Sequence, residues 1–382
     1  MFHLAEGKAY ITNITTNIYR ELQQHLNKLP IGYPETESGV EIELLKLLFT
    51  PEEALIATNM RLFPEPLKKI HRRVKKYGIK PKELEEVLAR MYKKGSISAS
   101  SLETENGIIK QYRIAFLAVG MFEYQVNQLT KEFYVNFEQY MDEGFRDEFA
   151  STKINQLRTI PIEKSLTPEH YISTYDELKE LIMNARKISV MNCVCRQGKD
   201  LIDKPCKATD MRELCFVFND SVQHIIDNNW GRVISKDEAL EILTRIQGEG
   251  LILQPGNAQD PNFLCCCCSC CCDLITNMKK LESPWELIHS NYYAEVEYES
   301  CVGCLSCLDR CPMEALDQID DAVQVTKNLC IGCGNCVVVC PEQAITLKKK
   351  SKELIPPKTT LDLYKEIMDR KAELRRVEKG NA

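Results

Sequence analysis

Residues 301–312 read CVGCLSCLDRCP, and residues 330–341 read CIGCGNCVVVCP. Both segments follow the pattern C-x-x-C-x-x-C-x-x-x-C-P, and the second copy begins 29 positions after the first. Ala315 and Ala344 also match, four positions after the last cysteine of each copy. Because the likeness extends beyond the cysteines, this segment is an internal duplication of one short loop.

The spacing of these cysteines predicts two iron-sulfur clusters that exchange one ligand. Three thiolates two residues apart can hold three corners of one [4Fe-4S] cluster, while the fourth ligand comes from the other copy. The predicted ligands are Cys301, Cys304, Cys307 and Cys340 for cluster one, and Cys330, Cys333, Cys336 and Cys311 for cluster two. Zinc ribbons also use C-x-x-C pairs, but they lack the third cysteine and the Cys-Pro ending.

The duplicated segment resembles the bacterial two-cluster ferredoxin domain, and all eight ligand positions are filled. The resemblance implies one-electron transfer at low potential, although cluster potentials span about −700 to +450 mV. Gly303, Gly332 and Gly334 are expected to let the backbone curl closely round the cluster sulfurs and aim amide hydrogens at them.

Acidic residues dominate this segment. Between Glu295 and Ile345 there are nine acidic residues and two basic ones. Such a surface attracts a redox partner that is basic at its docking face, although ordinary solvated charge would give the same count.

All 19 cysteines of the 382-residue chain fall between Cys193 and Cys340. The chain starts without a basic segment that leads into an apolar run, and no window approaches roughly 18 uninterrupted apolar residues. We therefore expect no membrane span and a cytoplasmic location, where thiols stay reduced and available for metals.

Eleven cysteines lie upstream of the duplicated loop, and seven of them fall in the run CCCCSCCC at residues 265–272. Cys193 and Cys195 share a face if the preceding strand continues, and Cys206 and Cys215 could complete a four-thiolate set. The run could instead supply some of these ligands, bind another cluster, or hold a cluster that uses adjacent cysteines. A store for copper or zinc is the alternative without redox chemistry.

The sequence thus predicts one or more additional iron-sulfur clusters. The candidate ligands are Cys193, Cys195, Cys206, Cys215, Cys265, Cys267, Cys268, Cys270, Cys271 and Cys272. Arg196, next to Cys195, either stabilises a reduced cluster or is a solvated side chain, and we favour the solvated side chain. His224 and His289 have no ligand-like neighbour and are expected to be ordinary.

The motif CVCR at residues 193–196, followed by Cys206, Cys215 and the cysteine run, is similar to a group of 4Fe-4S dicluster proteins of anaerobes. In those proteins the run reads C-N-C-C-x-C-C-C. This chain has Cys266 where the pattern has asparagine, so Cys266 is left out of the predicted ligands. LPIGYP at residues 29–34 and SGVE at 38–41 extend the resemblance. It implies iron-sulfur binding and a redox role, without a substrate.

The predicted fold class is α+β with several domains. Residues 1–165 form a helical, winged-helix-like domain, because helices at 64–77 and 81–94 precede strands at 96–103 and 108–115. The strands are joined at Asn106-Gly107, a strong hairpin signal. Thr50, Pro51, Glu52 and Glu53 form a capping box that begins an earlier helix.

Three further parts complete the prediction. Residues 166–290 are a Cys-rich α+β domain with helices at 175–187 and 236–247 and a strand at 188–194, and residues 291–350 are the ferredoxin domain. Residues 351–382 are a linker and a C-terminal helix that begins at Thr360.

Three functions from different classes fit these features. The first is an electron-transfer protein or subunit, and the second is an iron-sulfur oxidoreductase with its active site at Cys265–Cys272. The third is a redox-sensing DNA-binding regulator, because residues 61–94 contain twelve basic and four acidic residues. Glu83, Glu85 and Glu86 near the start of the candidate recognition helix argue against nucleic acid as a partner. Electron transfer to a redox partner protein is the function we expect.

Overall fold

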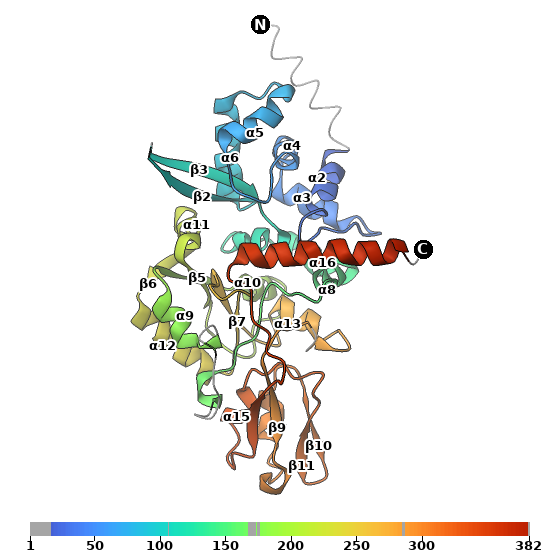
Figure 1. Ribbon diagram of the computed structural model, residues 1–382, viewed down its shortest axis with the longest axis vertical. Helices are drawn as coiled ribbons and strands as arrows, with labels where there is room; N and C mark the ends of the chain where they lie inside the picture. Colours follow the sequence, from blue (N-terminus) through green and yellow to red (C-terminus); the bar gives the residue numbers. More distant parts are fainter. Residues whose placement is uncertain (1–16, 106, 167–172, 174–175, 285–286, 381–382) are drawn as a thin grey trace. The chain divides into compact units, whose positions relative to one another are not determined.

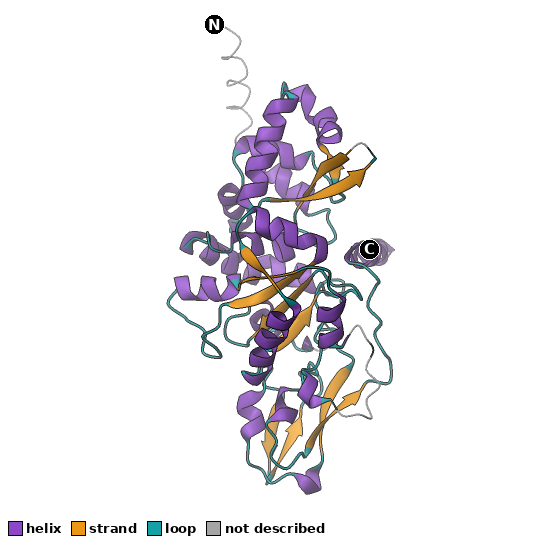
Figure 2. Ribbon diagram, turned by 90° about the vertical axis from the view of Figure 1, so that its left-hand side faces the viewer, coloured by secondary structure: helices purple, strands orange, loops and turns teal. Residues whose placement is uncertain are grey.

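The computed structural model describes residues 17–105, 107–166, 173, 176–284 and 287–380 (Figure 1). Helices and strands are mixed along the chain (Figure 2). The chain divides into two compact units, Met1–Phe149 with Ile226–Trp230, and Ala150–Ile225 with Gly231–Ala382. The finer division into four parts stays a prediction.

The first unit is mostly helical. Its longer helices are α2 (Ile18–Leu26), α3 (Val40–Leu48), α4 (Pro51–Thr58), α5 (Leu67–Val74), α6 (Pro81–Lys94), α7 (Lys131–Tyr140) and α8 (Arg146–Ala150). The predicted capping box at the start of α4 is confirmed, because the Thr50 hydroxyl accepts from the Glu53 N–H at 3.3 Å and the Glu53 carboxylate accepts from the Thr50 N–H at 2.8 Å. The predicted helix at 64–77 begins later, at Leu67, and ends in a 3-10 turn.

The first unit also contains a three-stranded antiparallel sheet, in the order β1-β3-β2. The strands are β1 (Glu65–Pro66), β2 (Ile97–Thr104) and β3 (Gly107–Ile114), and the last two lie within one residue of the predicted hairpin strands. Thr104 pairs with Gly107 at the hairpin end, while Asn106 lies outside the described residues. Helices and a hairpin are therefore present in the expected order, and the winged helix itself stays a prediction.

The second unit contains a five-stranded antiparallel sheet in the order β6-β4-β5-β8-β7. The strands are β4 (Ile188–Asn192), β5 (Glu213–Phe218), β6 (Gly231–Ile234), β7 (Ile252–Pro255) and β8 (Phe263–Cys267). The intervening helices are α9 (Leu178–Asn184), α10 (Val194–Leu201), α11 (Val222–Asp227), α12 (Lys236–Gly248) and α13 (Asp273–Met278). The predicted helix at 175–187 is shorter than expected, and Tyr175 lies outside the described residues.

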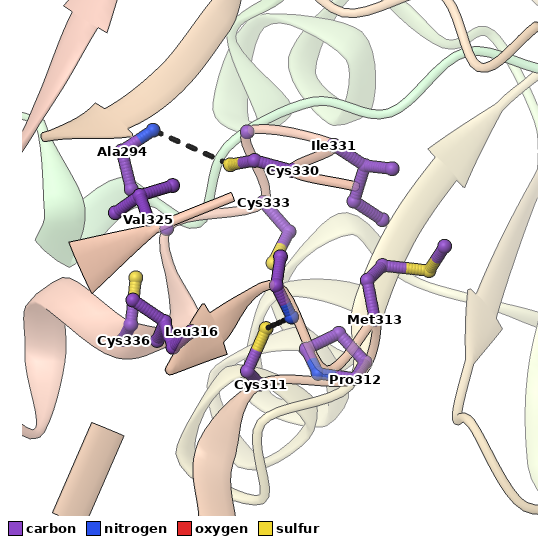
Figure 3. Close-up of a pocket in the computed structure, with 13 residues that line it drawn as sticks. Ala294, Cys311, Pro312, Met313, Leu316, Val325, Cys330, Ile331, Cys333 and Cys336 are labelled. Atoms are coloured by element: carbon purple, nitrogen blue, oxygen red, sulfur yellow. Dashed lines mark hydrogen bonds between the residues drawn. The ribbon is translucent and has the colours of Figure 1, made fainter. Parts of the chain in front are cut away.

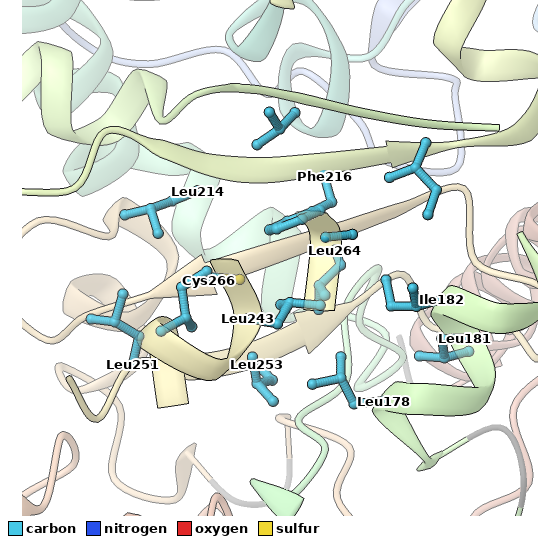
Figure 4. Packing of buried hydrophobic residues seen from close by; sticks show 14 of the residues in the cluster. Leu178, Leu181, Ile182, Leu214, Phe216, Leu243, Leu251, Leu253, Leu264 and Cys266 are labelled. Carbon is cyan, nitrogen blue, oxygen red and sulfur yellow. The ribbon is translucent and has the colours of Figure 1, made fainter. Parts of the chain in front are cut away.

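Apolar side chains from this sheet and from α9 and α12 form one core (Figure 4). Phe216 and Leu264 are fully buried register partners on β5 and β8. Ile182 of α9 and Leu243 of α12 belong to the same cluster. The core therefore holds the sheet and its two helices as one layered unit.

The strand order fixes where the cysteine-bearing ends meet. Both β4 and β8 run antiparallel to β5, which lies between them. The C-terminal ends of β4 and β8 therefore lie at the same end of the sheet as the N-terminal end of β5. Short helices α10 and α13 start there, after Cys193 and Cys272 respectively.

The ferredoxin segment contains two antiparallel strand pairs and two short helices. Strand β9 (Tyr292–Val296) pairs with β12 (Ile345–Lys349), and β10 (Leu316–Ile319) pairs with β11 (Ala322–Val325). Helices α14 (Ser306–Arg310) and α15 (Asn335–Val338) occupy equivalent places in the two copies. The backbone repeats as well, since Leu305 and Gly334, 29 positions apart, both have left-handed φ angles of 62° and 81°.

Hydrogen bonds attach this segment to the end of α12 and the turn before β7. Asn335 donates to the Gly250 carbonyl at 2.8 Å, and Arg310 donates to the Gly248 carbonyl at 2.6 Å. The Ile162 N–H donates to the Cys333 carbonyl at 3.0 Å. The ferredoxin segment and the five-stranded sheet are thus joined within the second unit.

Helix α16 (Thr360–Gly380) begins at the predicted residue. Leu363 and Ile367 are buried, and Gln156 donates to the Tyr364 hydroxyl at 2.9 Å. Among the helices of the described ranges, none combines the length and the apolar character that crossing a membrane requires.

A buried ion pair holds the segment before α9 onto the sheet. Arg158 and Asp176 are 3% and 4% exposed and lie 3.3 Å apart, and Arg158 also donates to the carbonyls of Gly256 and Ala258. Arg158→Ala leaves Asp176 buried without its cation, so we expect a loss of about 3–5 kcal/mol in the free energy of unfolding. Urea unfolding followed by circular dichroism under anaerobic conditions measures this loss.

The matched control is Arg186→Ala. Arg186 pairs with Asp220 at 2.9 Å, but the two side chains are 73% and 90% exposed. Removing this solvated pair is expected to change stability by no more than about 1 kcal/mol. Equal losses for the two variants would contradict the structural importance of the Arg158 pair.

Candidate metal centres

The four predicted ligands of cluster two line one small cavity (Figure 3). These thiols belong to Cys311 from the first copy of the loop and to Cys330, Cys333 and Cys336 from the second. Ala294, Leu316 and Val325 form part of the apolar wall. The structure therefore brings together residues from both copies, as the exchange of one ligand requires.

Backbone amides point at these sulfurs. The Ala294 N–H donates to the Cys330 sulfur at 3.4 Å, and the Ala315 N–H donates to the Cys311 sulfur at 3.3 Å (Figure 3). Hydrogen bonds to ligand sulfur stabilise the negative charge of an iron-sulfur cluster. Ala315 is one of the two alanines that repeat beyond the cysteines, which gives this part of the duplication a physical reason.

The thiols of the other set also lie together. Burial raises the pKa of Cys307 to about 11, and the charges of Cys304, Cys340 and Cys301 act in the same direction. Burial likewise raises the pKa of Cys333 to about 12. Since iron binds the thiolate, cluster assembly displaces protons that these buried thiols otherwise hold.

The two sets differ in their access to solvent. Cys304 is exposed, and the neighbouring Val302 side chain is 63% exposed. Cys330, Cys333 and Cys336 are all buried. The start of the first loop is thus at the surface, while Cys307 of that loop and the cavity of the second copy are inside.

Two glycines allow close backbone contact in equivalent positions. Gly303 and Gly332 have φ angles of 64° and 65°. A Cβ atom at Gly332 would lie 2.2 Å from the Tyr292 carbonyl, and one at Gly303 would lie 2.4 Å from the Asp321 carbonyl. Both positions therefore require glycine for conformation and for space.

The upstream thiols form two groups. The first is a set of six thiols, each of which interacts electrostatically with the next, in the order Cys265, Cys215, Cys193, Cys195, Cys272 and Cys267. Cys215 and Cys265 are register partners on β5 and β8. We call this set the six-thiol network, and it lies where β4 and β8 end.

The second group consists of Cys206, Cys268, Cys270 and Cys271, whose sulfur atoms all lie within 4.8 Å of one another. We call it the tetrad. A hydrogen bond from Cys271 lowers the pKa of Cys268 to about 5, and Arg196 acts in the same direction. The predicted combination of Cys206 with Cys193, Cys195 and Cys215 is therefore divided, because Cys206 lies with the cysteine run.

Arg196 corrects the expectation of a solvated side chain. Its side chain is fully buried, and its Nη1 atom donates to the Cys266 carbonyl at 3.3 Å. Its Nε and Nη2 atoms have no hydrogen-bond partner among the described residues. Burial opposes its charge, but thiolates at Cys193, Cys268 and Cys206 outweigh burial and raise its pKa. A buried cation with this environment requires thiolate charge nearby.

Cys266 and His289 have ordinary structural places. Cys266 is buried in the apolar core, where its register partner is Leu253 (Figure 4). The Nδ1 atom of His289 lies 3.0 Å from Asn257 Nδ2, and its Nε2 atom lies 3.1 Å from the Lys153 carbonyl.

Sequence reasoning missed Asn335 and Arg310, the two side chains that attach the ferredoxin segment to the end of α12 and the turn before β7, because no local pattern marks such contacts.

Comparison with known proteins identifies the ferredoxin segment. A family model described as a 4Fe-4S dicluster domain matches residues 294–341, and a second model with the same description matches residues 329–369. The first match contains all eight cysteines of the duplicated loop, and the second overlaps its second copy. The chain therefore carries a ferredoxin-type region for two [4Fe-4S] clusters. No curated protein and no solved structure matches the chain.

The exchange of ligands predicts how two single substitutions differ. Cys311→Ser removes one ligand of cluster two, so the cage of Cys330, Cys333 and Cys336 should lose its cluster, and about four irons with it. Cys340→Ser should instead empty the cage of Cys301, Cys304 and Cys307. Iron and sulfide quantification with EPR of the reduced proteins distinguishes the two losses.

The two variants serve as controls for each other, because each removes a Cys-Pro cysteine from one copy. Pairing Cys311→Ser with Cys301→Ser should remove both clusters, whereas pairing it with Cys330→Ser should remove only one. The opposite pattern would show that each copy supplies all four ligands of its own cluster.

Proposed function

We propose that this protein is an electron-transfer protein, or the electron-transfer subunit of a larger enzyme. It passes single electrons through the two ferredoxin clusters to a further iron-sulfur centre at the six-thiol network. The proposed cluster ligands are the eight cysteines of the duplicated loop, in the exchanged sets given above. The support for the ferredoxin part is the family match to residues 294–341.

One observation carries the proposed route between the clusters and the network. Asn335, which precedes the predicted ligand Cys336, donates to the Gly250 carbonyl at 2.8 Å. Ile252, two residues further on, is the register partner of Cys267 on β8. A short path therefore connects cluster two with the six-thiol network. It crosses the Asn335–Gly250 hydrogen bond, follows the chain to Ile252, and crosses the pairing of β7 with β8 to Cys267.

The surface of the first loop favours entry of electrons at cluster one. Val302 and Cys304 are exposed, and the exposed Glu342 carboxylate acts on the Cys304 thiol. Asp321, whose carbonyl lies against Gly303, is exposed as well. This acidic border supports docking of a basic redox partner beside cluster one.

An iron-sulfur oxidoreductase is the second candidate. Six thiols exceed the four that one cubane binds, so the network has ligands for a larger cluster or for a position open to substrate. In this case the same route supplies electrons to a reaction at Cys265–Cys272. The two candidates share their electron path and differ only in what happens at its end.

The third candidate, DNA binding through a winged helix, has less support. Several basic side chains of the first unit pair with carboxylates: Arg73 with Glu65, Arg90 with Glu52 at 3.1 Å, and Lys94 with Glu53. Glu83, Glu85 and Glu86 are exposed at the start of α6. Because these ion pairs and carboxylates reduce the positive field at the proposed recognition helix, phosphate binding there is disfavoured.

The route is tested by following the reduction of each centre. Anaerobically purified protein is mixed with reduced methyl viologen and freeze-quenched for EPR. In the wild type all centres should be reduced, with the network centre after the ferredoxin clusters. In Cys311→Ser, which lacks cluster two, cluster one should still be reduced while reduction of the network centre becomes at least an order of magnitude slower. An unchanged rate at the network centre would exclude the route through cluster two.

The docking surface predicts a dependence on salt. Cytochrome c, a basic one-electron acceptor, should be reduced by the holoprotein at a rate that falls as ionic strength rises. The substitutions Asp321→Asn and Glu342→Gln together should lower this rate at least about threefold at low salt and weaken its salt dependence. The control is Glu241→Gln, an exposed residue of α12 in the second unit. An equal effect of the control would place the docking site for basic partners elsewhere.

A further inference from the structure

We propose that the tetrad of Cys206, Cys268, Cys270 and Cys271 binds a single zinc ion, separate from every iron-sulfur cluster of this protein. All four residues carry free thiols. Four separations between their sulfurs are 3.7 Å for Cys206–Cys268, 3.8 Å for Cys206–Cys270, 3.5 Å for Cys268–Cys270 and 3.6 Å for Cys270–Cys271.

These separations fit four thiolates on one ion. A Zn–S bond of about 2.3 Å in tetrahedral geometry places the sulfurs about 3.8 Å apart. In a [4Fe-4S] cluster each thiolate binds a different iron, so the four sulfurs lie farther apart than they do around one ion. The tetrad is therefore too compact for a cubane, and its dimensions match a mononuclear site.

The ferredoxin cysteines provide an internal comparison. Within the described residues, the tetrad is the one group of three or more potential ligands whose donor atoms all lie within 4.8 Å of one another. Each of the two ferredoxin sets contains four thiols, but their sulfur atoms do not all lie within 4.8 Å of one another. The protein thus contains sets of thiols whose sulfurs are spaced widely enough for a cluster, and one set whose sulfurs are close enough to bind a single ion.

Local structure explains how the tetrad forms. The Cys272 N–H donates to the Cys268 carbonyl at 3.3 Å, so the chain turns tightly after β8 and brings Cys268, Cys270 and Cys271 together. Cys206 comes from the loop after α10 and supplies the fourth sulfur. Cys268 and Cys271 are buried, while Cys206 and Cys270 are partly exposed, which leaves access for an ion.

The surroundings compensate the charge of such a site. Four thiolates and one Zn²⁺ carry a net charge of about −2. The buried Arg196 guanidinium interacts with Cys206 and Cys268, and the Lys207 N–H donates to the Cys270 thiol. A closed set of four thiolates with donors around it is typical of a structural zinc site, which here would fasten the loop after α10 to the turn after β8.

Two single substitutions separate this site from the network. Cys270→Ser should remove about one equivalent of zinc from the anaerobically purified protein and leave its iron, sulfide and ferredoxin EPR signals unchanged. Cys267→Ser, three residues away in the six-thiol network, should lower iron and sulfide and retain zinc. Elemental analysis of both variants, purified from medium that contains iron and zinc, provides the comparison.

The wild-type protein gives a test that does not depend on folding of the variants. X-ray absorption at the zinc edge should show four sulfur neighbours at about 2.3 Å and no metal neighbour. Absence of zinc from the wild type, or joint loss of iron and sulfide from Cys270→Ser, would overturn the proposal. The ferredoxin EPR signals are read in the same samples, so failure of the zinc site is distinguishable from failure of the proposed electron transfer.

Discussion

Compensation of buried thiolate charge is the constraint on which this structure depends. Metals bind thiolates, and a thiolate in a protein interior needs hydrogen-bond donors or a cation nearby. The ferredoxin segment meets this need with backbone amides such as those of Ala294 and Ala315. The sheet domain meets it with Arg196, a fully buried guanidinium that interacts with thiols of both the tetrad and the six-thiol network. Each arrangement follows from the local fold. In the ferredoxin segment the loop curls round the sulfurs, and in the five-stranded sheet Arg196 lies in the first turn of α10, just after β4 ends.

The sequence predicted the ferredoxin segment because its ligands have fixed spacing and lie within one short repeated loop. Cys311 falls beside Cys330, Cys333 and Cys336 since the same loop is folded twice and the copies pack together. The hairpin strands β2 and β3 and the start of α16 were also predicted to within one residue, because turn and capping signals are local. The assignment of individual cluster ligands remains a prediction.

The upstream thiols were less predictable for a physical reason. Cys206 and Cys268 are 62 residues apart in sequence, and only the order of strands in the sheet decides that they meet. Spacing alone grouped Cys206 with its nearer neighbours Cys193, Cys195 and Cys215. Arg196 was misjudged because charged side chains are rarely buried without a partner, and two of its thiolate partners, Cys206 and Cys268, come from other segments of the chain.

The division of the cysteine run between two groups explains why it needs so many cysteines. Along β8, side chains alternate between the faces of the sheet, so Cys265 and Cys267 reach the network while Cys266 enters the core. The turn that follows directs Cys268, Cys270 and Cys271 to the tetrad, and Cys272 returns to the network, where its thiol interacts with that of Cys195. A shift of one residue in the register of β8 would exchange the core and network positions. The run therefore contains two interleaved sets of thiols and one cysteine, Cys266, that belongs to neither, and the pairing of β8 with β5 and β7 keeps each sulfur in its own set.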